Sequence, residues 1–389
     1  MPPRIVLVAG EASGDLLGGS LALALREQAP DAVIAGVCGP AMREAGVEAW
    51  HDCSVLSVMG IAEVIKHLPR LLRFRRELLD QILAFDPDVV VGIDAPDFNL
   101  GLERRLKARG IRTLHYVSPS IWAWREGRAA KIQRACDEVL CLFPMEPPIY
   151  AKYGAKATLV GHPLADEFPL NPDTHGARDR LGLDRPRPVL ALLPGSRVGE
   201  IHRLLPTFLE CARALAAERP SLQFALPVAN AACRVAIGEV MARVSATAPE
   251  AWAPVLKRIT HIDGQSRDVL MAADVVLLAS GTAALEAMLA KKPMVVAYRV
   301  APLTYFIAKG IGLVKVDRYS LPNILANQAL VPECMQDDCR PEVILPLLRE
   351  RLSAGWPHAE IPTFARLHRE LSAGAARTAA TRVLSYAPR

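Results

Sequence analysis

Short apolar runs alternate with amphipathic stretches along the whole chain. In the first half, runs of four to six residues have the length and the branched residues that are typical of buried parallel strands. These runs are Arg4 to Ala9, Val33 to Cys38, Val89 to Ile93, Thr113 to Val117, Glu138 to Leu142 and Ala157 to Val160. Helices are expected in the gaps between them, so the pattern predicts a parallel sheet.

The same pattern restarts in the second half. Further strands are expected at Val189 to Leu193, Gln223 to Pro227, Ile259 to Ile262, Val275 to Ala279 and Met294 to Ala297. A chain of 389 residues with 51% apolar content exceeds the size at which single cores usually divide. The sequence therefore predicts an α/β protein with two Rossmann-like, doubly wound domains.

The boundary between the domains is predicted near Gly161-His162-Pro163, ahead of a stretch that contains Pro and Asp. We expect an N-terminal domain over residues 1–163, a C-terminal domain over 164–341, and helices in 342–389 that pack back toward the N-terminal domain. Ligands of doubly wound sheets bind beyond the carboxyl ends of the strands, so a cleft between the domains is the expected site.

Composition narrows the functional classes. The first apolar run, Ile5 to Ala9, is too short for a signal peptide and no run approaches a membrane span, which predicts a cytoplasmic protein. Eight cysteines without a C-x-x-C pair predict reduced thiols and no metal site. The net charge of +5 suits anionic phosphates or lipid head groups, and no nucleic-acid motif is present.

The most informative segment is the turn after the strand that ends at Ala279. Gly281 and Thr282 lead into a helix expected from Ala283, so free N–H groups and the positive end of the helix dipole meet there. Glu286, one turn further on, is placed to accept hydrogen bonds from sugar hydroxyls. This geometry favours a nucleoside-diphosphate sugar. The alternative is an ordinary strand-turn-helix in which Thr282 caps the helix.

Two other loops are predicted at the same edge of the second sheet. Arg197 follows a glycine turn after the strand that ends at Leu193, where its guanidinium can lie against a diphosphate and replace a metal ion. Gly264, in the segment HIDGQS, can hold a base through its backbone. An arginine that is merely solvated is the alternative for Arg197.

In the first domain, a strand ends at Asp94. A positioned carboxylate with a pKa raised by partial burial can remove a proton from a sugar hydroxyl, so Asp94 is the expected general base. The alternative is a structural carboxylate that accepts loop N–H groups. Asp97 is expected to cap the helix that begins near Phe98.

The first strand leads into GEASGD, which contains Glu11, Ser13 and Asp15. This spacing is not the G-x-G-x-x-G of dinucleotide binders, so no nicotinamide or flavin cofactor is predicted. One interpretation is a tight glycine turn with Ser13 or Asp15 as a cap. The functional interpretation adds a polar contact to substrate.

The segment from Met59 to Leu83 carries apolar residues at helical spacing together with basic residues. It suits an anionic membrane surface, and Pro69 would kink one helix or start a second. The alternative is a core-packed helix with a solvated basic face. The residues expected to face a membrane are Val64, Ile65, Leu68, Leu71, Leu72, Arg70, Arg73 and Arg76.

Six motifs, running in order from residue 8 to residue 326, together resemble the lipid-A-disaccharide synthase family: VAGEASGD, GIDAPDFN, HYVSPSIWAWR, LLPGSR, LLASGTAALEAMLAKKPMVVAYR and SLPNILA. The resemblance implies the GT-B fold and a glycosyltransferase that is peripheral on the inner face of the cytoplasmic membrane. It implies UDP-2,3-diacylglucosamine as donor and 2,3-diacylglucosamine 1-phosphate (lipid X) as acceptor. The products would be the β-1,6-linked disaccharide 1-phosphate and UDP.

The resemblance also implies roles for the residues above. Asp94 would deprotonate the acceptor's primary hydroxyl, which would attack and invert the donor's anomeric carbon without a metal. The residues expected at the nucleotide are Arg197, Gly264, Gly281, Thr282, Ala283, Glu286, Asn323 and Gln328. Glu11, Ser13 and Asp15 would line the acceptor side. A homo-oligomer is compatible with this picture.

Two other classes remain open from the sequence. A UDP-sugar 2-epimerase of the same two-domain architecture would act on a soluble sugar nucleotide and would not need the basic amphipathic segment. A non-catalytic sugar-binding protein would usually be exported and would release no UDP. Dependence on lipid substrates separates these classes from the synthase.

Overall fold

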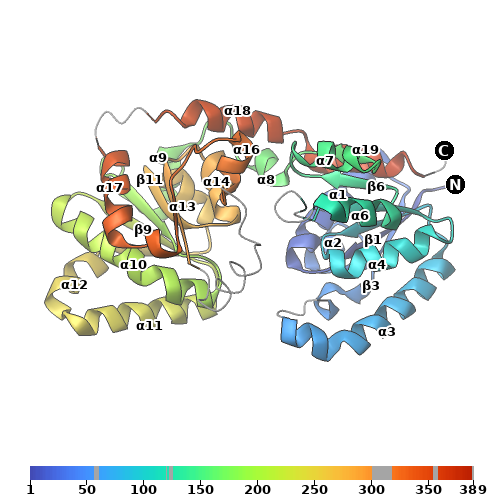
Figure 1. Cartoon of the computed structure of the whole chain (residues 1–389), viewed down its shortest axis with the longest axis horizontal. Helices are drawn as coiled ribbons and strands as arrows, with labels where there is room; N and C mark the ends of the chain where they lie inside the picture. Colours follow the sequence, from blue (N-terminus) through green and yellow to red (C-terminus); the bar gives the residue numbers. More distant parts are fainter. Residues whose placement is uncertain (57–60, 120, 122–125, 300–317, 354–357, 388–389) are drawn as a thin grey trace. The chain divides into compact units, whose positions relative to one another are not determined.

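The chain folds into two compact units (Figure 1). A computed structural model describes residues 1–56, 61–119, 121, 126–299, 318–353 and 358–387, and leaves out the side chains of 61–68. The first unit contains Met1–Asp166 together with Glu370–Arg389, and the second contains Glu167–Arg369. The observed boundary lies three residues beyond the predicted one.

A seven-stranded parallel sheet of order β3-β2-β1-β4-β5-β6-β7 forms the centre of the first unit. Its strands are β1 (Arg4–Ala9), β2 (Val33–Cys38), β3 (Glu48–Asp52), β4 (Val89–Ile93), β5 (Arg112–Tyr116), β6 (Glu138–Cys141) and β7 (Ala157–Leu159). The residues of β4 are all buried, because helices cover both faces of a parallel sheet.

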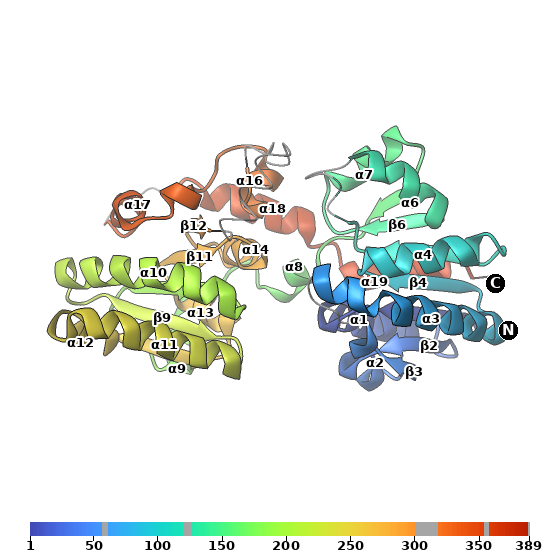
Figure 2. The same ribbon diagram turned by 60° about the horizontal axis from the view of Figure 1, so that its bottom comes forward.

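The helices of the first unit lie on the two faces of its sheet (Figure 2). The helices are α1 (Ala12–Gln28), α2 (Pro40–Glu44), α3 (Ile61–Phe85), α4 (Pro96–Lys107), α6 (Ala129–Ala135), α7 (Glu146–Lys152), α8 (Pro163–Glu167) and α19 (Ala375–Leu384). Helix α1 packs against α2 and α19, whereas α4 packs against α3 and α6. The short helices η1 (Cys53–Val55) and η2 (Glu126–Arg128) complete the unit.

The second unit repeats the architecture with a six-stranded parallel sheet of order β10-β9-β8-β11-β12-β13. Its strands are β8 (Val189–Leu193), β9 (Gln223–Val228), β10 (Ile259–Asp263), β11 (Val275–Ala279), β12 (Met294–Tyr298) and β13 (Glu333–Met335). Its helices are α9 (Thr174–Leu181), α10 (Val198–Glu218), α11 (Ala231–Thr247), α12 (Pro249–Leu256), α13 (Ser266–Ala272), α14 (Thr282–Leu289), α16 (Leu321–Ala326), η3 (Gln336–Asp338), α17 (Pro341–Arg351) and α18 (Ile361–Leu371).

The C-terminal helices divide between the two units, which corrects the expectation that residues 342–389 pack back as one block. Helix α17 packs against α10, and its Ile344 and Leu348 lie in the core of the second unit. Only α19 returns to the first unit, where Ala379 and Val383 join the core beside α1. The two helices divide in this way because the apolar residues of α17 are buried in the core of the second unit, whereas those of α19 are buried in the core of the first.

Each sheet has a topological switch point, where successive crossovers leave in opposite directions. In the first sheet it lies between β1 and β4, and in the second it lies between β8 and β11. The loops that leave the carboxyl ends of these four strands contain four of the residues singled out from the sequence: Glu11, Asp94, Arg197 and Gly281. The two α/β sheets therefore confirm the predicted fold class.

Candidate functional site

The second unit contains a cavity of about 440 Å³ at its switch point. The loops after β8, β10 and β11 line it, together with the end of β9. The lining residues are Leu193, Gly195, Ser196, Arg197, Glu200, Pro227, Ala229, Gly264, Gln265, Ser266, Ala279, Ser280, Gly281, Thr282, Ala283 and Glu286. Six of the eight residues expected at a nucleotide are thus brought together: Arg197, Gly264, Gly281, Thr282, Ala283 and Glu286.

The turn at Gly281 presents a helix N-terminus to this cavity. Gly281 is the N-cap of α14, and no side chain caps the helix, so Thr282 is not the cap. Its φ of 150° favours glycine, and a Cβ built there would meet no atom within 4 Å. The N–H groups of the first turn are therefore open to an anion and aligned with the positive end of the helix dipole.

Arg197 brings an exposed positive charge to the same cavity. It precedes α10, its side chain is 75% exposed, and its Nη1 lies 3.3 Å from Oε1 of Glu200. Glu200, which the sequence did not single out, is only 12% exposed. A Cβ on Gly195 would lie 2.3 Å from Oε2 of Glu200, so this glycine, at φ 113°, makes room for the carboxylate. Glu200 thereby orients the guanidinium at the cavity wall.

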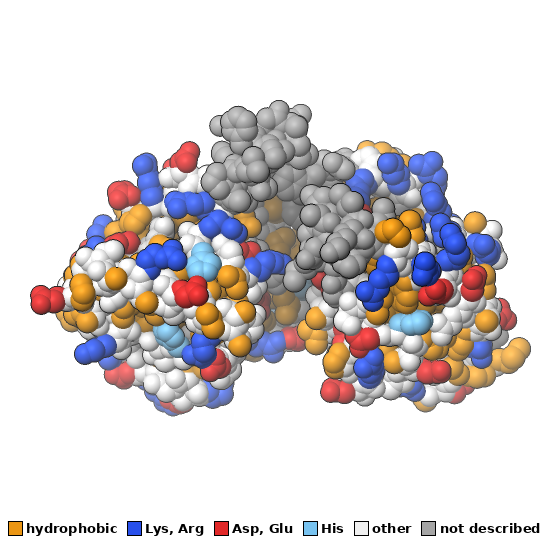
Figure 3. All heavy atoms as spheres, turned by 90° about the horizontal axis from the view of Figure 1, so that it is seen from below, with side chains coloured by type: hydrophobic (Ala, Val, Ile, Leu, Met, Phe, Trp, Pro, Cys, Tyr) orange, Lys and Arg blue, Asp and Glu red, His pale blue; other side chains and the backbone are white. Residues whose placement is uncertain are grey.

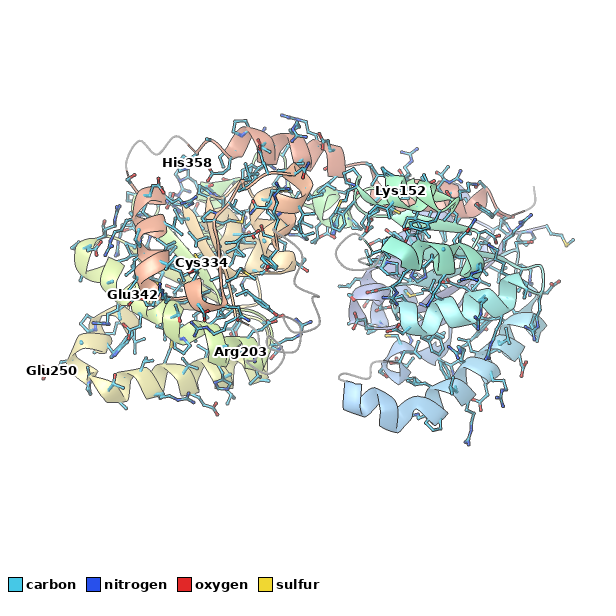
Figure 4. All side chains as sticks on the ribbon, in the orientation of Figure 1. Lys152, Arg203, Glu250, Cys334, Glu342 and His358 are labelled. Carbon is cyan, nitrogen blue, oxygen red and sulfur yellow. The ribbon has the colours of Figure 1, made fainter. Side chains whose placement is uncertain are left out.

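Arg203 lies within α10, and its contacts differ from those of Arg197. Arg203, labelled in Figure 4, donates from Nε to the carbonyl oxygen of Arg299 just beyond β12, at 3.1 Å. It does not line the cavity. Its side chain holds the main chain at Arg299, so of these two arginines Arg197 is the one that lines the cavity.

The third wall of the cavity comes from the loop after β10. Gly264 and Gln265 adopt φ of 61° and 49°, and Gln265 precedes α13. The N–H of Gly264 donates to the carbonyl oxygen of Val228 at 2.9 Å, which ties this loop to β9. Two successive left-handed residues turn the main chain back toward the cavity.

Glu286 lies one turn into α14 and lines the same cavity. Burial raises the pKa of its carboxyl group; Arg267 nearby lowers it, and Glu167 raises it. A half-buried carboxylate that still reaches the cavity can accept hydrogen bonds from sugar hydroxyls.

Asn323 and Gln328 do not line the cavity. The side chain of Asn323 is 2% exposed and donates to the carbonyl oxygen of Val331 at 2.9 Å. Its Oδ1 accepts the N–H groups of Leu330 and Val331 at 2.7 and 2.8 Å. Its amide holds α16 to the residues that lead into β13, and the expectation that Asn323 contacts the nucleotide stays a prediction. Gln328 is exposed in the following turn.

In the first unit, Asp94 sits in a tight turn at the end of β4. Asp94 and Ala95 both have positive φ, 52° and 43°, which costs free energy in residues with a Cβ. The N–H of Asp94 donates to the carbonyl oxygen of Tyr116 at 2.9 Å. A Cβ on Gly10 would lie 2.1 Å from that of Ala95, so the loop after β1 must have glycine there.

The electrostatics of this turn suit a general base. Burial raises the pKa of the Asp94 carboxyl group, the N–H of Ala95 opposes that rise, and the charge of Glu11 adds to it. Asp97 is not the cap of α4: Ala95 occupies the N-cap position and the Asp97 side chain is exposed, 3.5 Å from Arg128.

The residues expected on the acceptor side separate into two kinds. Glu11 and Ser13 are exposed at the start of α1, and the hydroxyl of Ser13 donates to Oε1 of Glu11 at 3.0 Å. Asp15 is 3% exposed and accepts the N–H groups of Gly39, Ala41 and Met42 at 2.7 to 3.1 Å. The carboxylate of Asp15 thereby holds the start of α2, and the expectation that Asp15 contacts the acceptor stays a prediction.

Helix α3 is one continuous helix that contains Pro69. Arg70, Arg73 and Arg76 are exposed, Leu72 is 40% exposed and Leu71 is half-buried. Figure 3 shows basic and hydrophobic side chains mixed on the face of the first unit that is seen from below. The side chains of Val64, Ile65 and Leu68 lie outside the described residues. Within the described part of the chain, no helix is long and apolar enough to cross a membrane.

Comparison with known proteins identifies the family. Residues 5–383 match the lipid-A-disaccharide synthetase family. A lipid-A-disaccharide synthase of Xanthomonas campestris pv. campestris (strain 8004) is 53% identical over 384 residues, 97% of this chain and 86% of that protein. One of Xylella fastidiosa (strain 9a5c) is 51% identical over 391 residues, 99% of this chain and 98% of that protein.

Solved structures match at the level of the fold. The glycotransferase of kitacinnamycin has a TM-score of 0.63 at 17% identity and covers 100% of both chains. The UDP-GlcNAc 2-epimerase from Neisseria meningitidis has a TM-score of 0.59 at 12% identity and covers 98% of both chains. Sequence identity over nearly the whole length decides between these neighbours: the chain belongs to the lipid-A-disaccharide synthetase family, whose members are glycosyltransferases.

Proposed function

We propose that this protein joins UDP-2,3-diacylglucosamine to 2,3-diacylglucosamine 1-phosphate and inverts the donor's anomeric carbon. The products are the β-1,6-linked disaccharide 1-phosphate and UDP. The observation that carries this proposal is the cavity of the second unit, where Arg197 and the open N-terminus of α14 line one space in a chain of this family. A diphosphate is the ligand that such a combination of guanidinium and free N–H groups favours.

The acceptor step is assigned to Asp94. Its carboxylate takes the proton from the primary hydroxyl of the acceptor as the oxygen forms a bond to the donor's anomeric carbon. A carboxylate with a pKa raised by burial is a stronger base than a fully solvated one, which is what proton removal from a sugar hydroxyl requires. Glu11 and Ser13 at the start of α1 are proposed to contact the acceptor.

The donor step is assigned to the cavity of the second unit. As the anomeric carbon–oxygen bond breaks, its electron pair passes to the diphosphate of UDP. Arg197 and the N–H groups after Gly281 stabilise that negative charge, more strongly in the transition state than in the bound donor. Glu286 accepts hydrogen bonds from the ribose, and the loop at Gly264 borders the base.

Helix α3 is proposed to lie on an anionic membrane surface, from which both acylated substrates are drawn. Exposed Arg70, Arg73 and Arg76 supply the charge and exposed Leu72 the apolar contact. In this proposal the enzyme acts at the inner face of the cytoplasmic membrane.

The experiment mixes detergent-purified protein with UDP-2,3-diacylglucosamine, with and without lipid X, and follows UDP release and product mass. Release of UDP that depends on the acceptor, with a tetraacyl disaccharide 1-phosphate as product, supports the proposal. A parallel reaction contains UDP-GlcNAc alone. Isomerised UDP-GlcNAc without any disaccharide would instead indicate an epimerase and would contradict the proposal.

A further inference from the structure

A cluster of three polar side chains lies buried beneath the Asp94 turn, and the proposed mechanism assigns no role to any of them. Asn99 and Glu103 come from α4, and His115 comes from β5. All three are at most 1% exposed. Polar groups are rarely buried this deeply unless they are hydrogen-bonded, so the cluster needs an explanation.

Asn99 connects this cluster to the turn. Its Nδ2 lies 2.9 Å from the carbonyl oxygen of Asp94, 3.2 Å from that of Val8 and 3.3 Å from that of Ile93. The shortest of these bonds holds the peptide group that follows Asp94. Since the N–H of Asp94 is held by Tyr116, hydrogen bonds fix the backbone of the proposed base on both sides.

Gly92 makes room for the cluster. It pairs with His115 in the register of β4 and β5. A Cβ on Gly92 would lie 2.1 Å from Oε1 of Glu103 and 2.9 Å from Cβ of Asn99. Asn99 and Glu103 are four residues apart on one helix, so their side chains lie on the same face and both press on this glycine. Nδ1 of His115 is 2.8 Å from Oε1 of Glu103.

The cluster contains buried polar atoms without a hydrogen-bond partner, and it needs one more donor. Within the described part of the chain, Oδ1 of Asn99, Oε2 of Glu103 and Nε2 of His115 are buried and have no hydrogen-bond partner. Oδ1 of Asn99 can only accept, and an ionised Glu103 can only accept as well. A proton on Oε2 of Glu103 would supply a donor to a cluster in which Oδ1 of Asn99 lacks one. Oε1 can still accept from Nδ1–H of His115.

We propose that Glu103 is protonated in the folded protein and acts as a positioning residue: its Oε2–H fixes the carboxamide of Asn99, which in turn holds the Asp94 turn. This inference rests on the proposed role of Asp94 as the base. Burial is the main influence on the pKa of Glu103 and raises it, whereas His115, which is hydrogen-bonded to the carboxyl group, lowers it. The thiol of Cys136 is a further buried ionisable group in the same surroundings. His115 anchors the far end of the chain of hydrogen bonds.

The first test compares two substitutions of Glu103 by steady-state kinetics. In Glu103→Gln the amide can still donate to Asn99 and accept from His115, so most of the wild-type kcat should remain. In Glu103→Leu both bonds are lost and the turn is released. We expect kcat to fall by about 10- to 100-fold, because a small misplacement of a catalytic group has effects of that order. KM for the UDP-sugar should not change, since its proposed binding cavity is in the second unit.

A matched control separates positioning from stability. Glu138 is buried in the same sheet and pairs with Arg382, but it lies at the start of β6, at the edge opposite to Asp94. Glu138→Gln should lower Tm without lowering kcat. The proposal is overturned if Glu103→Leu keeps wild-type kcat, or if Glu103→Gln loses as much activity as Glu103→Leu, because the second result would mean that the charge matters.

Infrared spectroscopy tests the proton directly, including the case in which Glu103→Leu does not fold. Wild-type protein should show the carbonyl stretch of a buried protonated carboxylic acid, which disappears in Glu103→Gln. The absence of that band would overturn the proposal. If Asp94→Asn keeps wild-type turnover, the assignment of the base fails instead, and the infrared result still reports the state of Glu103.

Discussion

The turns after β4 and β11 occupy equivalent places in the two sheets, since each strand neighbours the first strand of its sheet. Their construction is opposite. The first turn is held by its neighbours: Gly10 lies against Ala95, and Asn99 holds the backbone from below. The second turn is open, because nothing lies within 4 Å of a Cβ built on Gly281 and no side chain caps α14.

The difference corresponds to two kinds of chemistry. A general base must keep one orientation toward the proton it removes, so its backbone is fixed by buried hydrogen bonds even at the cost of two residues with positive φ. An anion site needs free N–H groups and close approach, so its backbone is left uncovered. The same fold position can therefore supply a rigid carboxylate in one unit and an accessible helix end in the other.

The largest effect is expected at the packed turn. Asp94→Asn keeps the shape of the side chain and removes the base, so kcat should fall by about 10³-fold or more. Binding of UDP, measured by calorimetry, should remain at the wild-type level because the cavity lies in the second unit. Turnover close to that of the wild type would contradict the assignment of the base.

The next largest effect is expected at Arg197, which lines the same cavity as the open turn. Arg197→Ala removes the guanidinium from the cavity, and kcat/KM for the donor should fall by about 10²-fold. Arg213→Ala is the matched control, since Arg213 lies further along α10, pairs with Glu210 and does not line the cavity. Equal losses in both variants would indicate damage to α10 instead of a lost ligand contact.

Substitutions of Gly10 and Gly281 compare the two turns most directly. Gly10→Ala places a methyl group 2.1 Å from Cβ of Ala95, so the Asp94 turn must move and kcat should fall by about tenfold while UDP affinity is kept. Gly281→Ala meets no neighbour but strains φ at 150°, so UDP affinity should fall by about tenfold. Kinetics and calorimetry on both variants measure this split. Loss of UDP affinity in Gly10→Ala together with loss of kcat in Gly281→Ala would contradict the difference between the two turns.

The smallest effect is a shift in pH dependence. The negative charge of Glu11 disfavours ionisation of Asp94 and so raises its pKa, in addition to burial. In Glu11→Gln that pKa falls, the base stays deprotonated to lower pH, and the acidic limb of the kcat/KM profile should move to lower pH by less than about one unit. A limb that moves to higher pH would mean that Glu11 acts on a different group.

The strand bounds show how much of the fold the apolar pattern predicts. β1, β2, β4, β8 and β11 have the predicted bounds, because central parallel strands are buried on both faces and read as continuous apolar runs. The pattern missed β3 (Glu48–Asp52), where Glu48, His51 and Asp52 are polar and no residue is fully buried, and β13, which has only three residues. Both lie at the edge of a sheet, where one side of the strand is left unpaired and burial no longer dictates the sequence.

For the candidate site, the sequence by itself determined which residues follow the carboxyl ends of the strands. That was enough to predict that Arg197, Gly264, Gly281 and Glu286 share one space, because parallel strands deliver their ends to one edge. It could not determine which polar side chains are free for a ligand. Asp15 and Asn323 are hydrogen-bonded to main-chain groups, and Glu103 on α4 is hydrogen-bonded to His115 on β5. Only the tertiary structure decided these, because their partners come from other elements and burial, not sequence position, sets their hydrogen bonds.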